Sequence, residues 1–364
     1  MNVLFLESFF GGSHKNFAEG FCKFWRGRVD LVSLPARFWK WRVRGAAFEF
    51  IQRIDRSELS NYDLMVVTSL TSIAELKAFW SSHCPPVILY MHESQLDYPM
   101  SKGQALDMHF VINDFSNCLH ADKILFNSAT HRDSYLYKLS QYLDKLPDFT
   151  PTKLIDQLLE KTCVAHPGCH FEEKIALRPW HEEVLTILWN HRWEHDKCPE
   201  DFFNILNKLK SEKVNFRLRV LGESYRSKPR CFDEARVQLA DCIDHWGFVD
   251  SVTEYYQHLA NSHIIISTAI QENFGISVVE AMRYGCYPLL PKRLSYPEIL
   301  PTDFHEDCLY ESLDELKTKL TNILRKPFCY ESASQKISEK MTRYSWDTQI
   351  NRFHELLGTV GDLC

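Results

Sequence analysis

The chain has 364 residues, too many for one ordinary hydrophobic core, and this length indicates two domains of roughly 150 to 200 residues each. Hydrophobic residues make up 45% of the chain and charged residues 25%, proportions that are ordinary for a globular protein in water. The net charge of −6 excludes a uniformly basic protein that coats nucleic acid, but it is compatible with a local basic patch.

We expect neither a targeting signal nor a metal-binding motif in this sequence. The opening stretch MNVLFLESFF carries Glu7 and has neither a basic segment nor a cleavage site, so we expect no secretory signal. No apolar run of about 18 residues occurs, so we expect no membrane span. None of the twelve cysteines forms a C-x-x-C pair, and Cys163, His166, Cys169 and His170 are spaced more widely than zinc ligands usually are. We therefore predict a cytoplasmic protein with reduced thiols and no metal site.

The first half of the chain alternates apolar strands with helical patterns. A strand at 2–6 (NVLFL) ends at GGSH and is followed by a helix over 14–25. Further buried strands are predicted at 64–69, 87–92 and 123–128, each followed by a helical stretch. Because these strands are apolar throughout, they predict a parallel sheet that is covered on both faces. Residues 138–160 resemble an insertion to which we assign no role.

A second set of strands begins after the sequence AHPGCHFEE, whose Pro-Gly pair and polar residues suit a connection between domains. Strands are predicted at 184–190, 216–224, 263–269 and 286–291, with helices at 200–212 and 345–357. The fold class is therefore α/β, with two Rossmann-like lobes. We expect one lobe at 1–170, a second at 171–344, and a C-terminal helical segment, 345–364, that packs back toward the first lobe.

In open parallel sheets, ligands bind beyond the carboxyl ends of the strands, and several polar residues stand at such positions. The sequence after one of these strands is QENFGISVVEAMRYG, in which Glu272 and Glu280 lie on either side of Gly275. Gly275 allows a tight turn into a helix, whose first amides favour a phosphate. Each carboxylate is a good acceptor for sugar hydroxyls. Glu280 could instead be a buried acid that backbone amides satisfy.

Two cations, Arg192 and Lys197, follow another strand of the same lobe. Such a pair can hold a diphosphate and neutralise it as it leaves. The alternative is a solvated pair of charges. Because both side chains are expected at the edge of a binding site, we expect the fold to survive the loss of either one.

These residues resemble the donor lobe of the family-four retaining glycosyltransferases. The resemblance covers nearly the whole second half and is carried by HWGFVD, by YYQHLANSHIIISTAIQENFGISVVEAMRYGCYPLL and by Arg192 and Lys197. Glu272 and Glu280 match that family's Glu-x7-Glu motif. It implies a GT-B fold, in which two Rossmann-like parallel-sheet lobes face a central cleft. It also implies donor-binding roles for a set of residues: Gly11, Gly12, Ser13, Arg192, Lys197, Gly222, Gly247, Phe248, Glu272, Asn273, Phe274, Gly275, Ile276 and Glu280.

The N-terminal lobe is similar to the subfamily of tRNA-queuosine mannosyltransferases, through LFLESFFGGSHKNFAEG, YMHESQLDYP and AHPGCHF. This similarity implies GDP-mannose as the donor substrate and queuosine-containing tRNA, of the aspartate type, as the acceptor. It places His92 opposite the donor sugar, as a catalytic residue with Glu272, Arg192 and Lys197, although a lone histidine is more often structural. It also implies acceptor-binding roles for His14, His92, Glu93 and Gln95.

The mechanism that we expect is metal-independent transfer with retention. No D-x-D sequence occurs in the chain, and sugar-nucleotide enzymes that use a divalent cation usually hold it with paired carboxylates. Arg192 and Lys197 would replace the cation. Glu272 would bind sugar hydroxyls and Glu280 the nucleotide ribose. We expect no cofactor.

A basic and aromatic stretch, RFWKWRVR at 37–44, is the candidate contact with tRNA. Arg37, Lys40, Arg42 and Arg44 alternate with aromatic residues, which suits phosphate contacts and stacking on unpaired bases. Residues 1–60 hold ten Lys or Arg and six Asp or Glu, a local charge of +4. The stretch could equally be an amphipathic segment that buries its aromatic side chains. In a transferase with a lipid or polysaccharide acceptor, it could dock on a membrane. A nonenzymatic GT-B protein is disfavoured because both glutamates and both cations are present.

Overall fold

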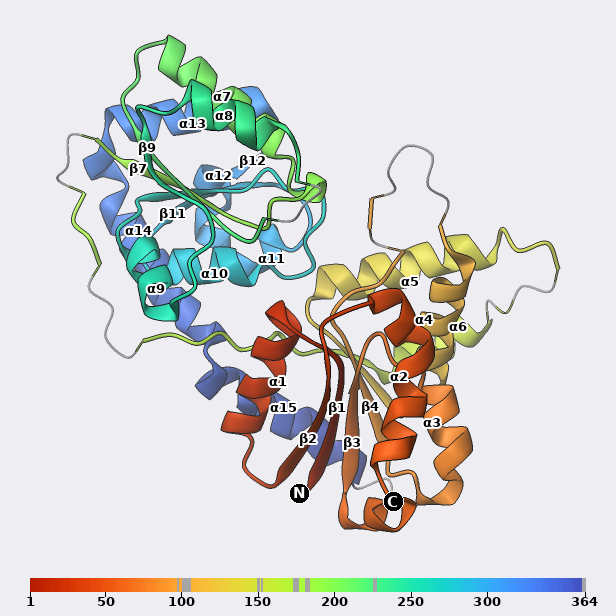
Figure 1. Cartoon of the computed structure of the whole chain (residues 1–364). Coiled ribbons are helices and arrows are strands. Elements are labelled where there is room, and N and C mark those ends of the chain that lie inside the picture. Colours follow the sequence, from red (N-terminus) through yellow and green to blue (C-terminus); the bar gives the residue numbers. More distant parts are fainter. Residues whose placement is uncertain are drawn as a thin grey trace. The chain divides into compact units, whose positions relative to one another are not determined.

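The structure is a computed structural model that describes residues 1–96, 98–99, 106–148, 151, 153–172, 177–180, 184–224 and 228–361 (Figure 1). The chain divides into two compact units. Unit 1 comprises Met1–His170 and Tyr344–Cys364, and unit 2 comprises Phe171–Arg343. Residues 149, 150 and 152 of the expected insertion and residues 362–364 of the C-terminal segment lie outside the described residues.

Unit 1 is a parallel sheet between two layers of helices. Its strands are β1 (Val3–Phe10), β2 (Val29–Pro35), β3 (Leu64–Thr68), β4 (Val87–Met91), β5 (Lys123–Phe126) and β6 (Thr162–Val164). Its α-helices are α1 (Gly12–Phe24), α2 (Trp39–Arg53), α3 (Ile73–Trp80), α4 (Met108–His120), α5 (Ala129–Leu143), α6 (Lys153–Lys161) and α15 (Trp346–Gly361). The described part of the expected insertion therefore contains the end of α5 and α6 up to its last residue but one.

The two faces of the sheet in unit 1 have separate hydrophobic cores. On one face, α1 and α15 cover the sheet, and Trp346 and Phe353 of α15 pack against Phe17 and Phe21 of α1. On the other face, α2 to α6 cover the sheet through side chains such as Phe50, Trp80 and Tyr135. The central strands β3 and β4 are buried along their whole length, as expected for a parallel sheet that is covered on both sides.

Unit 2 repeats this architecture with a different connection order. Its strands are β7 (Thr186–Asn190), β8 (Arg217–Leu221), β9 (Ile243–Trp246), β10 (Ile264–Ile266), β11 (Tyr287–Pro291) and β12 (Leu309–Tyr310). Its α-helices are α7 (Pro199–Ser211), α8 (Cys231–Gln238), α9 (Val252–Ala260), α10 (Ile276–Arg283), α11 (Tyr296–Ile299), α12 (His305–Cys308), α13 (Leu313–Arg325) and α14 (Glu331–Lys340). Figure 1 shows α7, α8 and α13 on one side of the sheet and α9, α10 and α14 on the other.

Each described sheet has six strands, all paired in parallel, in the orders β2-β1-β3-β4-β5-β6 and β12-β11-β10-β7-β8-β9. The prediction of two Rossmann-like parallel-sheet lobes is confirmed. The order reverses between β1 and β3 in unit 1 and between β7 and β10 in unit 2. At such a reversal the loops that leave the two strands diverge, and ligands bind in the crevice between them.

Candidate active site

The reversal point of unit 2 brings together the loops that follow β7 and β10. After β7 the chain passes Arg192 and forms the short 3-10 helix η3 (His195–Lys197). The main-chain carbonyl of Asp196 accepts hydrogen bonds from the amides of Ile270 and Gln271 in the loop after β10, at 2.9 and 3.3 Å. The Thr268 hydroxyl donates to the carbonyl of Lys197 at 2.9 Å. The two loops therefore form one braced surface, from which the charged side chains project.

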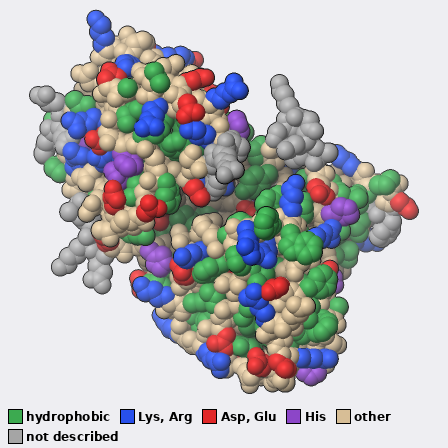
Figure 2. Space-filling view, viewed as in Figure 1, with side chains coloured by type: hydrophobic (Ala, Val, Ile, Leu, Met, Phe, Trp, Pro, Cys, Tyr) green, Lys and Arg blue, Asp and Glu red, His purple; other side chains and the backbone are tan. Residues whose placement is uncertain are grey.

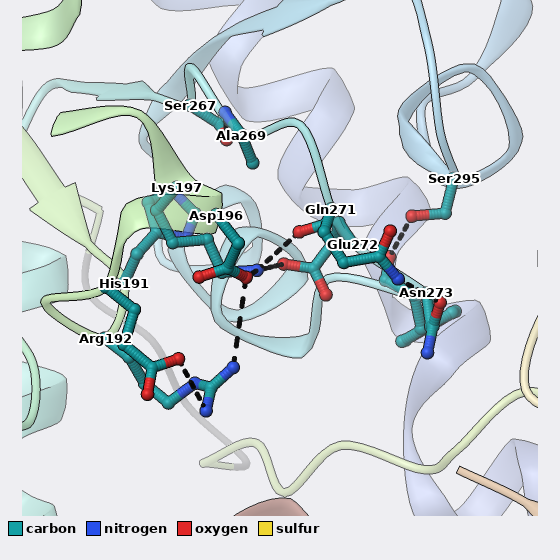
Figure 3. Close-up of polar contacts among 12 residues, drawn as sticks. His191, Arg192, Asp196, Lys197, Ser267, Ala269, Gln271, Glu272, Asn273 and Ser295 are labelled. Atoms are coloured by element: carbon teal, nitrogen blue, oxygen red, sulfur yellow. Dashed lines mark hydrogen bonds and ion pairs between the residues drawn. The ribbon is translucent and has the colours of Figure 1, made fainter. Parts of the chain in front are cut away.

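The Lys197 ammonium joins three acceptors of this surface. Its ammonium lies 2.6 Å from the carbonyl oxygen of Gln271, 3.2 Å from Asp196 Oδ2 and 3.3 Å from Glu272 Oε2 (Figure 3). An ammonium has three N–H donors, so three acceptors match its full capacity. Its side chain is only 7% exposed and that of Asp196 only 9%. Loss of Lys197 would leave two poorly hydrated carboxylates close together, which argues for a cost in stability; survival of the fold without Lys197 stays a prediction.

Arg192 differs from Lys197 in its exposure. Its side chain is 43% exposed and pairs with Glu194 at 2.9 Å and, at 4.0 Å, with Asp196. Burial raises the pKa of Glu194, although Arg192 acts in the opposite direction. His191, beside it, is buried, and its burial together with nearby Lys197 lowers its pKa to about 3. A neutral His191 adds no charge, so Arg192 is the accessible cation of this cluster.

Gly275 joins this surface to α10. Its φ of 95° lies in the left-handed region, which only glycine adopts readily, and its carbonyl accepts from the amides of Val278 and Val279. The preceding loop is held by side chains: Gln271 donates to Asn273 at 2.9 Å, and Ser295 donates to the carbonyl of Phe274 at 2.9 Å. The turn thus begins the helix directly beside Glu272.

Glu280 lies one turn along α10 and is partly buried. Its Oε2 accepts a hydrogen bond from the Tyr255 hydroxyl at 2.7 Å, and the Asn190 side chain donates to the same tyrosine oxygen at 2.9 Å. Burial raises the pKa of Glu280 to about 7, and the Tyr255 hydroxyl opposes that increase. A side chain, rather than the backbone amides considered from the sequence, therefore stabilises this acid.

The other predicted donor-binding residues of unit 2 are spread along the carboxyl edge of the sheet. Gly222 follows β8 with φ 115°, and a Cβ there would lie 2.1 Å from the carbonyl oxygen of His191. Gly247 and Phe248 follow the edge strand β9, and Phe248 is exposed. Ile276 begins α10 and is half-buried, whereas Phe274 is buried. Gly222 is thus next to the charged cluster, while Gly247 and Phe248 are two strands away from it.

The reversal point of unit 1 has a different composition. Glu7, on β1, is fully buried, and its Oε1 accepts from the amide of Phe9 at 2.8 Å and lies 3.2 Å from His14 Nδ1. The His14 ring stacks on that of His92, with centroids 4.0 Å apart and planes at 28°. Burial tends to lower the pKa of His14, but Glu7 and, less strongly, Glu93 outweigh it, and the pKa is raised. Burial and the neighbouring His14 and His131 keep the pKa of His92 well below its usual value.

Glu7, His14 and His92 are also the group of described residues that could hold a metal ion, since a ligand atom of each lies within 4.8 Å of the others. The geometry fits a metal poorly. A metal binds in the plane of an imidazole, along the nitrogen lone pair, so two stacked rings direct their lone pairs side by side rather than toward one point. The expectation of no metal site stays a prediction.

The remaining predicted residues of unit 1 lie around this group. Gly11 precedes α1, and exposed Gly12 and Ser13 form its first turn. Glu93 accepts from the Tyr98 hydroxyl at 3.3 Å, and Gln95 lies in the turn that follows.

The basic stretch 37–44 starts α2, and the structure separates its residues. Arg37, Lys40 and Arg44 are exposed, whereas Arg42 is partly buried and donates to the carbonyl of Pro35 at 3.1 Å. Trp39 is half-buried against Phe110. The stretch is therefore only in part a segment that buries its aromatic side chains, and its contact with tRNA stays a prediction.

Three residues that join these clusters were not identified from the sequence: Glu7, Asp196 and Tyr255. Asp196 immediately precedes Lys197, and that adjacency was the available signal. Glu7 and Tyr255 lie inside a strand and a helix, and only the fold brings them to His14 and Glu280.

Both halves of the chain are similar to known proteins. Residues 2–169 match the family described as tRNA-queuosine alpha-mannosyltransferase N-terminal, and residues 171–343 match the family described as Glycosyl transferases group 1. A Drosophila melanogaster protein named tRNA-queuosine alpha-mannosyltransferase is 33% identical over 339 residues, which cover 90% of this chain and 88% of that protein. The chain belongs to the tRNA-queuosine α-mannosyltransferase family.

Solved structures support the fold of this family member. Sucrose-phosphate synthase from Thermosynechococcus elongatus has a TM-score of 0.76 at 12% identity, and all of both chains is covered. Anabaena HepE, in complex with UDP and glucose, has a TM-score of 0.70 at 14% identity, with 99% of this chain and all of that chain covered. The GT-B fold is confirmed, and the protein is a glycosyltransferase. No helix among the described residues is both long and apolar enough to cross a bilayer.

Proposed function

We propose that the protein transfers mannose from GDP-mannose to the cyclopentene-diol of queuosine in tRNA, with retention and without a metal ion. The observation that carries this proposal is the 33% identity, over 90% of the chain, to a tRNA-queuosine alpha-mannosyltransferase. The charged cluster at the β7/β10 reversal point is consistent with it, because that is where an open α/β sheet binds a nucleotide.

Arg192 and Lys197 are proposed to bind the donor diphosphate. Arg192 is accessible and presents a planar fork of N–H donors, which suits phosphate oxygens. Lys197 would exchange some of its protein acceptors for phosphate oxygens. Both cations would stabilise the negative charge that develops as the diphosphate leaves.

The two glutamates have separate proposed roles. Glu272, beside Lys197, would accept hydrogen bonds from sugar hydroxyls and stabilise the positive charge that develops at the anomeric carbon. Glu280, one turn further along α10, would accept from the ribose hydroxyls, for which its ionised form is the better acceptor.

The proposed reaction exchanges one bond at the anomeric carbon of the sugar for another. The bond between the anomeric carbon and the diphosphate oxygen breaks, and GDP leaves with the electron pair. One hydroxyl oxygen of the acceptor diol bonds to the same face of the sugar, and its proton passes to the departing phosphate oxygen. No D-x-D sequence is present to hold a divalent cation, so the two cationic side chains are proposed to neutralise the diphosphate.

In unit 1, His14 and His92 are proposed to bind the acceptor diol. The raised pKa of His14 favours its cationic form, and the depressed pKa of His92 favours its neutral form. Such a pair provides an N–H donor next to a nitrogen that can accept. A cytoplasmic location stays a prediction.

The test is a transfer assay with purified protein. Several labelled sugar nucleotides are incubated with queuosine-containing tRNA and, as the matched control, with the same tRNA carrying guanine at that position. The tRNA is then digested to nucleosides, which are analysed by mass spectrometry. We expect a hexose on queuosine from GDP-mannose only. Equal labelling of both tRNAs, or labelling of neither, contradicts the proposal and would favour a lipid or polysaccharide acceptor.

A further inference from the structure

The first turns of α2 present two large aromatic rings to solvent. Phe38 is 73% exposed and Trp41 is 64% exposed. Phe38 precedes α2 with φ 54°, a left-handed conformation that is rare for a residue with a bulky side chain. Its carbonyl accepts from the amides of Trp41 and Arg42 at 2.8 and 3.1 Å, which starts the helix at this point. The local backbone thus places a bulky ring in solvent.

Gly45 determines where the Trp41 ring lies. A Cβ at position 45 would come within 2.7 Å of the Trp41 indole, closer than such contacts occur, so the ring lies against the bare backbone one turn along α2. Glycine in a helix interior costs roughly 0.5–1 kcal/mol relative to alanine. Here that cost coincides with an indole that lies close to the backbone and is 64% exposed.

Three exposed cations are neighbours of the two rings in the sequence. Arg37, Lys40 and Arg44 are exposed, and no acidic residue occurs in 37–44. Figure 2 shows Lys and Arg side chains next to hydrophobic ones over the part of unit 1 where Figure 1 places α2. Exposed aromatic rings among positive charges are the composition with which proteins stack on unpaired bases and hold the adjoining phosphates.

A membrane surface is a weaker match to this patch. A helix that lies on a bilayer buries a continuous apolar face in it. The apolar face of α2 is already used, because Val43, Ala46, Ala47 and Phe50 are buried in unit 1. What remains for a partner is a few rings separated by charges.

We propose that Trp41, which lies against Gly45 and has Arg37, Lys40 and Arg44 near it in the sequence, is a stacking platform for an unpaired base of RNA. The proposal rests on the proposed function in so far as that RNA is the tRNA acceptor. The cations would contact phosphates on either side of the stacked base, while Phe38 provides a second exposed ring three residues earlier.

The experiment compares tRNA binding by four variants in gel-shift titrations at two salt concentrations. We expect Trp41→Ala to weaken binding roughly five- to a hundredfold, which corresponds to the loss of one stacked base. Trp41→Phe should retain part of the affinity. Phe79→Ala, on α3, is the matched control, because Phe79 is also an exposed ring, at 58%, and it should bind as the wild type does.

Gly45→Ala distinguishes a binding role from a structural one. Alanine has the higher helix propensity, so the thermal midpoint should stay the same or rise. RNA affinity should nevertheless fall, since the new methyl group displaces the indole. Reduced affinity together with unchanged or higher stability is the expected result, and unchanged affinity would overturn the proposal.

Two further outcomes also decide the question. If Trp41→Ala leaves tRNA binding unchanged but reduces sedimentation with phosphatidylserine vesicles, the patch is a membrane contact and the proposal is wrong. Transfer to queuosine-containing tRNA is measured in parallel. Failure of transfer together with Trp41-dependent RNA binding would contradict the proposed function and leave the platform standing.

Discussion

The two reversal points have the same position in their sheets, but they hold different kinds of charged and titratable side chains. In unit 2, two cations form ion pairs with three carboxylates: Arg192 and Lys197 with Glu194, Asp196 and Glu272. In unit 1, a buried carboxylate, Glu7, faces two stacked imidazoles. The difference suits the two tasks that we propose for them. A departing diphosphate needs permanent positive charge, whereas a neutral diol needs groups that donate and accept hydrogen bonds.

The most severe test of this contrast is Lys197→Ala. Turnover should fall roughly a hundred- to a thousandfold, because a charge-stabilising donor is lost. The free energy of unfolding should also fall, by about 3–5 kcal/mol, since Asp196 and Glu272 lose their shared cation. Chemical denaturation measures the second effect. The double variant with Asp196→Ala should recover part of that stability, and an unchanged denaturation midpoint in Lys197→Ala would show that the cluster is not coupled.

Arg192→Ala should separate activity from stability. We expect turnover to fall roughly ten- to a thousandfold, with weaker binding of GDP in calorimetry. Because the Arg192 side chain is on the surface, with 43% of it exposed, the unfolding free energy should change by no more than about 0.5 kcal/mol. GDP affinity equal to that of the wild type would remove Arg192 from the donor site.

Glu7→Gln should test the pairing of Glu7 with His14 in unit 1. The raised pKa of His14 means that the ionised pair stabilises the fold below the unfolded pKa of histidine, near 6.5, and that this contribution is lost as the pH rises through the folded value. The variant should therefore be less stable by about 1–3 kcal/mol at pH 6 and closer to the wild type at pH 9. Denaturation at both pH values measures this. GDP binding in unit 2 should not change, and an equal loss of stability at both pH values would contradict the ionised pair.

Donor binding should depend on pH through Glu280. Its pKa is raised to about 7, so the carboxylate ionises, and becomes the better acceptor for ribose hydroxyls, as the pH rises through that value. GDP affinity should increase roughly two- to tenfold between pH 6 and pH 8. Tyr255→Phe removes the hydrogen bond that opposes the shift and should move the transition to higher pH. A Glu280→Gln variant that retains the full pH dependence would assign the transition to another group.

Chelation should have the smallest effect. We expect mannose transfer to be unchanged in excess EDTA, since the proposed diphosphate clamp is made of side chains. The assay is run with and without added Mg²⁺ or Mn²⁺. Activity that EDTA abolishes and one of these ions restores would refute the metal-independent mechanism.

The sequence predicted the centre of each sheet better than its edges. The unpredicted strands are β2, β6, β9 and β12, the four edge strands of the described sheets. Continuous apolar runs mark strands that are buried on both faces, whereas an edge strand such as β2 is mostly half-buried and mixes polar with apolar residues. For this reason, a search for apolar runs finds the centre of a parallel sheet and misses its margins.

The site shows a similar division. Residues at strand ends could be identified because topology places them at one edge of a sheet. Their partners could not, since Glu7 and Tyr255 meet His14 and Glu280 through tertiary packing. The sequence also could not predict how exposed each side chain is. Arg192 and Lys197 stand five positions apart, yet Arg192 is accessible and Lys197 is buried.

The place of α15 in unit 1 has a consequence for synthesis on the ribosome. Unit 2 is one continuous stretch, so it can close its core as soon as Arg343 has emerged. One core of unit 1 contains Trp346, Ile350 and Phe353, which are translated after all of unit 2. Until then α1 keeps an apolar face exposed, as partly folded chains of this size commonly do. The lobe that is made first is therefore the one that finishes folding last, and chaperones that bind exposed apolar surface would meet it in the interval.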